Sequence, residues 1–149
     1  MEFVKFLPKF KHNDVHVRLG EDIPPVDLDI DQIHQVLLNL VNNSVEAKPT
    51  ASIELRTQYD PTTDSVLLTL KDDGPGIDEG IIDKLFTEKV TTKVDGHGYG
   101  LPICKHLIEA HGGTIAVQSV RGEGATFIMR FPVSSQHSQA LHANATPDR

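Results

Sequence analysis

A narrow polar stripe runs along a predicted helix at residues 31–47, and it consists of amides and one carboxylate. Its members stand four, four and three residues apart, which places them on one side of the helix: Gln35, Asn39, Asn43 and Glu46. A solvent face usually carries lysine and glutamate, and asparagine is a poor helix former. The stripe is either plain polar surface or a pocket wall in which an amide oxygen meets a hydrated cation.

A carboxylate followed by closely spaced glycines stands at the end of a predicted strand, residues 65–71. The chain there reads Asp72-Asp73-Gly74-Pro75-Gly76. Glycine lets a ligand approach the backbone closely, and Asp72 could accept a hydrogen bond from the exocyclic amine of a flat base. The same residues also suit an ordinary tight turn.

Three alternating glycines, Gly96, Gly98 and Gly100, precede a second predicted helix at residues 101–113. A helix start offers unpaired N–H groups and the positive end of the helix dipole, so an anionic phosphate would fit there beside Lys93. The spacing matches neither the P-loop nor the dinucleotide-binding fingerprint. Taken alone, the run therefore leaves a turn or a hinge as open alternatives.

Composition narrows the functional class. The chain has 149 residues and a formal charge of −7, with basic residues scattered along it, so we expect no nucleic-acid partner. Its single cysteine, Cys104, lies in an apolar helical context and excludes an internal disulfide. No apolar run approaches the roughly 20 residues of a membrane span, and no signal peptide is evident. We expect a cytoplasmic domain without direct membrane contact.

The elements that would position these groups alternate in type. Strands are predicted at 14–19, 52–59, 65–71, 114–120 and 125–132, and helices at 31–47, 79–86 and 101–113, with Asp29 or Asp31 capping the first. Hairpins covered by helices indicate an α+β fold, a two-layer α/β sandwich. We predict one domain at 1–133 and a disordered tail at 134–149, where the sequence is small, polar and patternless.

Five segments in this order resemble the motifs of the ATP-binding catalytic domain of sensor histidine kinases. That family (HATPase_c) belongs to the GHKL superfamily with DNA gyrase B, MutL and mitochondrial dehydrogenase kinases. The segments are QVLLNLVNNSVEA, DDGPGI, LFTEKVTTK, GHGYGLPI and GEGATF, within a match over residues 14–132. The sequences of these motifs are most similar to those of the nitrogen-regulation and sporulation type of sensor kinase. The resemblance implies a Bergerat fold: a mixed, mainly antiparallel sheet of about five strands, about three helices on one face, and a mobile ATP lid.

The resemblance also implies a site for ATP and Mg²⁺. Asn43 would hold the metal, with Asn39 lining the same site, and Asp72 would bond the adenine amine. Thr126 would assist at adenine, directly or through water. The other implied nucleotide-binding residues are Gly74, Gly76 and Ile77 beside the base; Thr91, Thr92 and Lys93, the candidate catalytic residue, at the phosphates; and Gly96, His97, Gly98, Tyr99, Gly100 and Leu101 around the second glycine run.

Some positions depart from the family pattern. Lys89 and Val90 stand where two aromatic residues are usual, and Tyr99 replaces a leucine. Asn39 occupies the position at which the hydrolase branch carries a glutamate general base, and an amide cannot take up that proton. This favours phosphoryl transfer, which needs positioning and charge neutralisation, over hydrolysis of the gyrase and MutL type. An anti-sigma-like serine kinase or binding module stays open.

The phosphoacceptor histidine of the family is absent. It is followed by an acidic residue, and none of the eight histidines here has such a neighbour. We therefore expect a monomeric catalytic domain that binds ATP–Mg²⁺ and phosphorylates a histidine only in trans, on the dimerisation and phosphoacceptor helices of a parent kinase. That parent would pass the phosphoryl group to a response regulator, and the isolated chain would be inactive without those helices.

Overall fold

A computed structural model describes residues 13–86 and 100–134 of the chain. They form one five-stranded sheet in the order β1-β2-β3-β5-β4, with three helices. Strand β1 runs parallel to β2, and every other pair is antiparallel. The bounds are β1 Val15–Arg18, α1 Ile30–Ala47, β2 Ile53–Asp60, β3 Ser65–Asp72, α2 Glu79–Ile82, α3 Gly100–Ala110, β4 Thr114–Val120 and β5 Gly124–Pro132.

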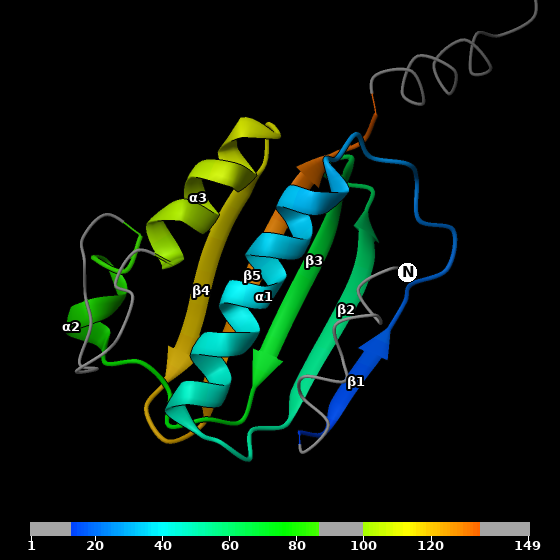
Figure 1. The fold of residues 1–149 in the computed structure, drawn as a ribbon. Coiled ribbons are helices and arrows are strands. Elements are labelled where there is room, and N and C mark those ends of the chain that lie inside the picture. The colour runs from blue at the N-terminus through cyan, green and yellow to red at the C-terminus, as the bar shows by residue number, and fades with distance from the viewer. Residues whose placement is uncertain (1–12, 87–99, 135–149) are drawn as a thin grey trace, which may run out of the picture.

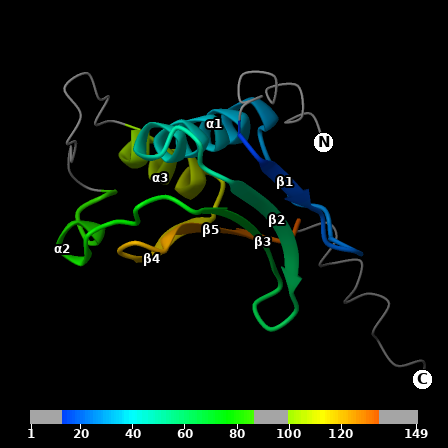
Figure 2. The ribbon, with the colours of Figure 1, turned by 90° about the horizontal axis from the view of Figure 1, so that it is seen from below.

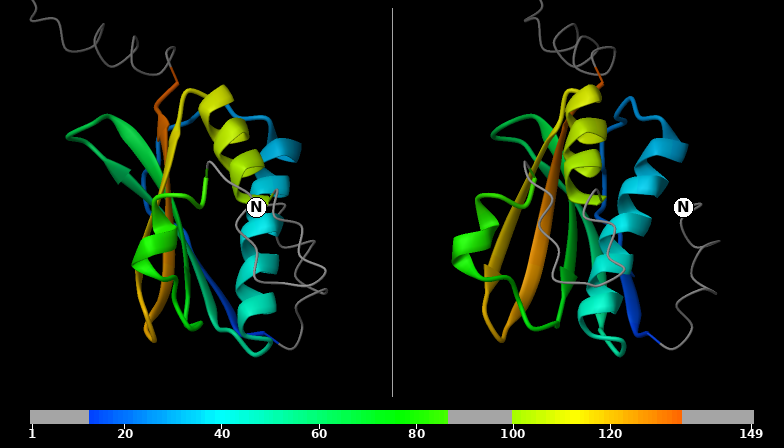
Figure 3. Two further views of the ribbon diagram at one scale, coloured as in Figure 1. Left: turned by 90° about the vertical axis from the view of Figure 1, so that its left-hand side faces the viewer. Right: turned by 60° about the vertical axis from the view of Figure 1, so that its left-hand side comes forward.

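The molecule has two layers. Helices α1 and α3 lie side by side over one face of the sheet, and the short α2 sits beyond the edge strand β4 (Figures 1 and 2). The side views in Figure 3 show the same separation of the helical layer from the sheet. The predicted two-layer α+β sandwich with a mixed five-stranded sheet is therefore confirmed.

The core lies between these layers because the strands alternate. Leu68 and Leu70 of β3, and Phe127, Met129 and Phe131 of β5, point toward the helices and are buried. The apolar side of α1 closes over them with Ile33, Val36, Leu37, Leu40 and Val41. Burying one such side chain stabilises the fold by about 1.5–3 kcal/mol, so α1 is held mainly by this face.

Asp29 is the residue that caps α1. Its carboxylate accepts from the Gln32 N–H at 3.2 Å, and its own N–H donates to His111 Nε2 at 3.0 Å. The second contact ties the start of α1 to the end of α3, whose Leu107 carbonyl accepts from His111 Nδ1 at 2.7 Å. Since Nε2 accepts and Nδ1 donates, His111 is the neutral Nδ1–H tautomer in this arrangement.

Two helices are shorter than predicted. Helix α2 ends at Ile82, and turns follow to Phe86. Helix α3 ends at Ala110, where the Gly113 N–H returns to the Ile108 carbonyl at 3.0 Å and Gly112 adopts φ +73°. In the part of the chain that the structure describes, no helix has the length and apolar character to cross a membrane. Ser134, the first residue of the predicted tail at 134–149, is buried and donates its N–H to the Pro25 carbonyl at 2.9 Å. The other tail residues, 135–149, lie outside the described residues.

Candidate functional site

Asp72, the last residue of β3, carries a buried carboxylate that three donors hold in place. Its Oδ1 accepts from the Gly74 N–H at 2.9 Å and from the Ala125 N–H at 3.1 Å. Its Oδ2 accepts from the Ser44 hydroxyl at 2.7 Å. The side chain is only 7% exposed, so these bonds offset much of the cost of removing it from water. A loop, a strand and α1 thus meet at one acidic group.

The loop after Asp72 packs against the turn between β4 and β5. A Cβ atom on Gly124 would collide with the Asp72 carbonyl oxygen, and one on Gly76 with the Val120 carbonyl oxygen. Both glycines have positive φ, +92° and +77°, and the Gly122 N–H donates to the Pro75 carbonyl at 2.7 Å. Glycine is required at these two positions because backbone approaches backbone, which separates them from an ordinary exposed turn.

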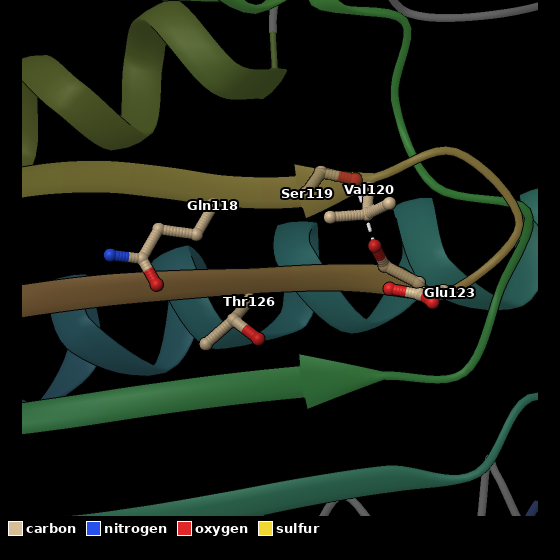
Figure 4. Close-up of a pocket in the computed structure, with 6 residues that line it drawn as sticks. Gln118, Ser119, Val120, Glu123 and Thr126 are labelled. Atoms are coloured by element: carbon tan, nitrogen blue, oxygen red, sulfur yellow. Dashed lines mark hydrogen bonds between the residues drawn. The ribbon is translucent and has the colours of Figure 1, made fainter.

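Ser119 joins the same two segments through its side chain. Its hydroxyl accepts from the Ile77 N–H at 2.8 Å and donates to the Gly124 carbonyl at 2.8 Å, the bond drawn in Figure 4. Ile77 is partly buried and packs against the core cluster. The Asp72 loop is therefore held at both ends, by Ala125 near its start and by Ser119 near its end.

Asp73, the neighbour of Asp72, has a different set of partners. It accepts from the Ser52 N–H at 2.8 Å and forms an ion pair with Lys48 at 3.1 Å. The Ser52 N–H, and then Lys48, hold the pKa of the Asp73 carboxyl below its ordinary value. The Asp73 side chain thus attaches the loop to the end of α1, and both of its carboxylate oxygens are used in these contacts.

The middle of the amide stripe faces α3. Asn39 Nδ2 lies 3.9 Å from Cys104 Sγ, and Asn43 Nδ2 lies 3.9 Å from the position of a Cβ on Gly100, the first residue of α3. Both asparagines are half-buried, whereas the flanking Gln35 and Glu46 are exposed. The stripe is thus divided: two amides line the α1–α3 contact, and two side chains face solvent.

Cys104 is fully buried at this contact, and burial raises the pKa of its thiol to about 11. The thiol is therefore protonated at neutral pH and behaves as a small apolar group, as the sequence predicts. Leu101, in the first turn of α3, packs partly buried against the core.

The structure places the Thr126 side chain on the other face of the sheet from Asp72, and its predicted role at adenine, directly or through water, stays a prediction. Thr126 pairs with Lys71 across the sheet, so its side chain lies on the face away from the helices, whereas Asp72 faces them. Figure 4 shows Thr126 in a shallow pocket with Gln118 and Glu123. Ala125 occupies the helix-facing position, and its backbone N–H makes the contact.

Of the residues predicted around the phosphates, Gly100 and Leu101 form the start of α3, and the others fall in a segment that the structure does not describe. Residues 87–99 lie outside the described part of the chain, and they include these candidates: Thr91, Thr92, Lys93, Gly96, His97, Gly98 and Tyr99, with the departures at Lys89 and Val90.

Three site residues escaped the sequence analysis: Ser44, Ser119 and Ala125. Ser44 had a usable signal, because it continues the buried side of α1 one turn after Leu40, where an apolar residue is expected. Ala125 acts through its backbone N–H, a group that every residue except proline carries, so its residue type gives no signal.

Comparison with known proteins fits this arrangement. Residues 28–135 match the family described as histidine kinase-, DNA gyrase B-, and HSP90-like ATPase, and the chain belongs to that family. Within it, the chain is a sensor histidine kinase catalytic domain, as its relatives indicate. Sensor histidine kinase ZraS of Salmonella typhimurium is 40% identical over 117 residues, 76% of this chain and 24% of that protein. Signal transduction histidine-protein kinase AtoS of Escherichia coli K12 is 35% identical over 125 residues, 83% of this chain and 20% of that protein.

Solved structures agree in fold. The nucleotide-free catalytic domain of histidine kinase ThkA superposes with a TM-score of 0.74 at 32% identity, covering 87% of this chain and 86% of that one. Full-length ShkA in complex with AMPPNP gives 0.76 at 26% identity, covering 88% of this chain and 28% of that one. The chain spans about a quarter of the length of the curated relatives named above, or less.

Proposed function

We propose that this domain binds ATP with the adenine amine on Asp72 and the phosphates toward the start of α3. One observation carries the proposal: three neutral donors fix a buried carboxylate, and no cation contacts it among residues 13–86 and 100–134. Such a group is acceptor-only and suits an N–H₂ of a base. Gly74, Gly76 and Ile77 would pass beside the ring, and Gly100 and Leu101 would offer backbone N–H groups at the other end.

Asn43 is the residue that would hold Mg²⁺. Its amide lies at the first turn of α3, and an amide oxygen is a suitable ligand for a hard cation. The described residues contain no group of three His, Cys, Asp or Glu side chains that could hold a metal by themselves. This agrees with a Mg²⁺ ion that takes one or two protein ligands and completes its shell with phosphates and water. Bound there, the ion would neutralise charge on the phosphates.

The reaction we propose is transfer of the γ-phosphoryl group to a histidine of a separate domain. Asn39, which contacts Cys104, supplies an amide where hydrolysis would need a base. Lys93, Thr91 and Thr92 would contact the phosphates. The bond between the γ-phosphorus and the oxygen that bridges it to ADP breaks, and ADP leaves. The unprotonated ring nitrogen of the partner histidine forms the new N–P bond, and the proton on the other ring nitrogen leaves to solvent. The protein contributes position and charge.

A phosphotransfer assay tests this proposal. The chain is incubated with γ-labelled ATP, Mg²⁺ and the dimerisation and phosphoacceptor helices of its parent kinase. We expect acid-labile label on the helices, and none when their acceptor histidine is replaced by glutamine. Rapid release of inorganic phosphate without labelled helices would instead favour a hydrolase.

The partners of the parent protein belong to the same proposal. Histidine kinase ThkA has been solved with the response regulator TrrA. We infer that the parent of this chain likewise passes its phosphoryl group to a response regulator, and that the domain at 1–133 acts as a monomeric, cytoplasmic module.

A further inference from the structure

Ser44 has one proton and two acceptors within reach. Its hydroxyl lies 3.1 Å from the Leu40 carbonyl, one turn earlier in α1, and 2.7 Å from Asp72 Oδ2. A hydrogen bond to a carboxylate is shorter and stronger than one to a neutral carbonyl. The proton therefore goes to Asp72, and the side chain, 3% exposed, is held in one orientation by its burial.

Counting acceptor sites on Asp72 shows what is left for a ligand. A carboxylate offers about four lone-pair sites. Oδ1 uses two of them, for Gly74 and Ala125, and Oδ2 uses one, for Ser44. Within the described residues, one site is left, on Oδ2. Because the carboxylate is planar, the two backbone donors on Oδ1 and the Ser44 hydroxyl on Oδ2 fix its orientation together, and Ser44 is the one donor to Oδ2 among the described residues.

We propose that Ser44 is a positioning residue that sets base selectivity through Asp72. The inference rests on the proposed function, because it concerns how that site distinguishes bases. With Oδ2 held by Ser44, its free lone pair has a fixed direction and meets the exocyclic amine of adenine. A base with a carbonyl at the same position would set an acceptor against an acceptor, which costs binding. Without the hydroxyl, Oδ2 has no donor among the described residues, and the two bonds to Oδ1 are left to resist rotation of the carboxylate about its bond to Cβ.

The test compares two ligands on two proteins. Calorimetry measures the affinity of wild type and Ser44→Ala for ATP and for purine riboside triphosphate, which lacks the amine. We expect wild type to prefer ATP by about tenfold or more, the value of one good hydrogen bond to a charged group. Ser44→Ala should weaken ATP binding about fivefold to tenfold and change the binding of the analogue less than about twofold, so the preference collapses.

Ser65→Ala is the matched control, because Ser65 is also buried but begins β3, at the end opposite Asp72. It should leave the ligand preference unchanged. Ser44→Thr keeps the hydroxyl and should restore the preference. If Ser44→Ala fails to give a cooperative melt, Ser44→Cys, nearly isosteric and a weaker donor, takes its place with the same expected loss.

The outcomes separate the two proposals. If Ser44→Ala weakens both ligands equally, the serine only packs, and the inference is overturned; an unchanged preference also overturns it. If wild type binds neither ligand, the proposed function itself fails. If wild type prefers ATP and the preference survives in Ser44→Ala, the proposed function stands without this role for Ser44.

Discussion

The two ends of strand β3 carry polar clusters of similar composition and different design. At the Ser65 end, Arg130 Nη1 lies 3.0 Å from Asp60 Oδ2, 2.6 Å from Thr63 Oγ1 and 3.0 Å from Ser65 Oγ. At the other end, the donors to Asp72 among the described residues are all neutral: the Ser44 hydroxyl and the N–H groups of Gly74 and Ala125. Each cluster contains an aspartate and a buried serine, and only the first contains a cation.

The presence of a cation gives the Asp60 cluster a structural role that the Asp72 cluster does not share. Arg130, followed by Thr63, holds the pKa of the Asp60 carboxyl below its ordinary value, so its charge is matched inside the protein. The charge of Asp72 is not matched by any cation among the described residues, and it keeps an acceptor site. A neutralised cluster fastens the β2–β3 hairpin to β5. A cluster with neutral donors and a free lone pair is arranged to receive a ligand.

Removing the carboxylate at each end gives the largest expected contrast. Asp72→Asn should weaken ATP binding about a hundredfold or more, because the amide must turn its oxygen to the two backbone donors and then sets its NH₂ against the adenine amine and Ser44. The matched variant Asp60→Asn should lower the midpoint of thermal unfolding and leave ATP affinity unchanged. Calorimetry with a parallel melt measures both. Equal effects of the two variants on affinity would contradict the distinction between the clusters.

Glycine substitutions test how firmly the turn holds Asp72. Gly124→Ala brings a Cβ into the Asp72 carbonyl oxygen, whereas Gly122→Ala, also at positive φ, meets nothing within 4 Å. We expect Gly122→Ala to lower the free energy of unfolding by about 1–2 kcal/mol through strain alone. Gly124→Ala should cost about 3 kcal/mol and also weaken ATP binding, because Asp72 must shift. Denaturant unfolding measures the pair, and equal losses would mean that the close approach is unimportant.

Lowering the pH should reduce the stability contributed by the cluster of Asp60 and Arg130. Since the folded pKa of Asp60 lies below the ordinary value of 3.8, its contribution to stability is present above that pH and is lost as pH falls through the lower folded value. We therefore expect the stability difference between wild type and Asp60→Asn to be largest near pH 7 and to shrink below about pH 4. Urea midpoints at pH 7 and pH 3 check this. A difference that grows on acidification would contradict the assigned role of Arg130.

The smallest effect is expected at Asp73, next to the ligand group. Asp73→Asn keeps an acceptor for the Ser52 N–H and loses the exposed ion pair with Lys48, which is worth about 0.2–1 kcal/mol. ATP affinity should change less than about twofold. A loss of ATP affinity comparable to that of Asp72→Asn would contradict the assignment of ligand binding to Asp72 and of a structural role to Asp73.

The sequence predicted the order of elements because each of them has a strong local signal. Alternation in the strands, the apolar face of α1 and the Gly112-Gly113 stop all act within a few residues. The motif order also singled out Asp72 and Asn43. In the structure, Asp72 contacts Ser44 of α1 from the end of β3, and Asn43 lies beside Gly100 at the start of α3.

The sequence alone could not predict contacts that depend on strand register or on the backbone. Thr126 and Ala125 differ by one position, and one step along a strand reverses the face of the sheet. Ser44 and Asp72 are 28 residues apart, and their bond exists only once α1 covers β3. The hydrogen bond of Asp73 with the Ser52 N–H and its ion pair with Lys48 depend in the same way on tertiary packing.

The measurement that tests the account most directly is calorimetry of the wild-type chain with ATP and with GTP, each with and without Mg²⁺. We predict saturable one-to-one binding of ATP, strengthened by Mg²⁺, and binding of GTP weaker by about tenfold or more, because its ring carbonyl would face the Asp72 carboxylate. Absence of saturable ATP binding, or equal affinity for the two nucleotides, would contradict the central claim that Asp72 receives the adenine amine.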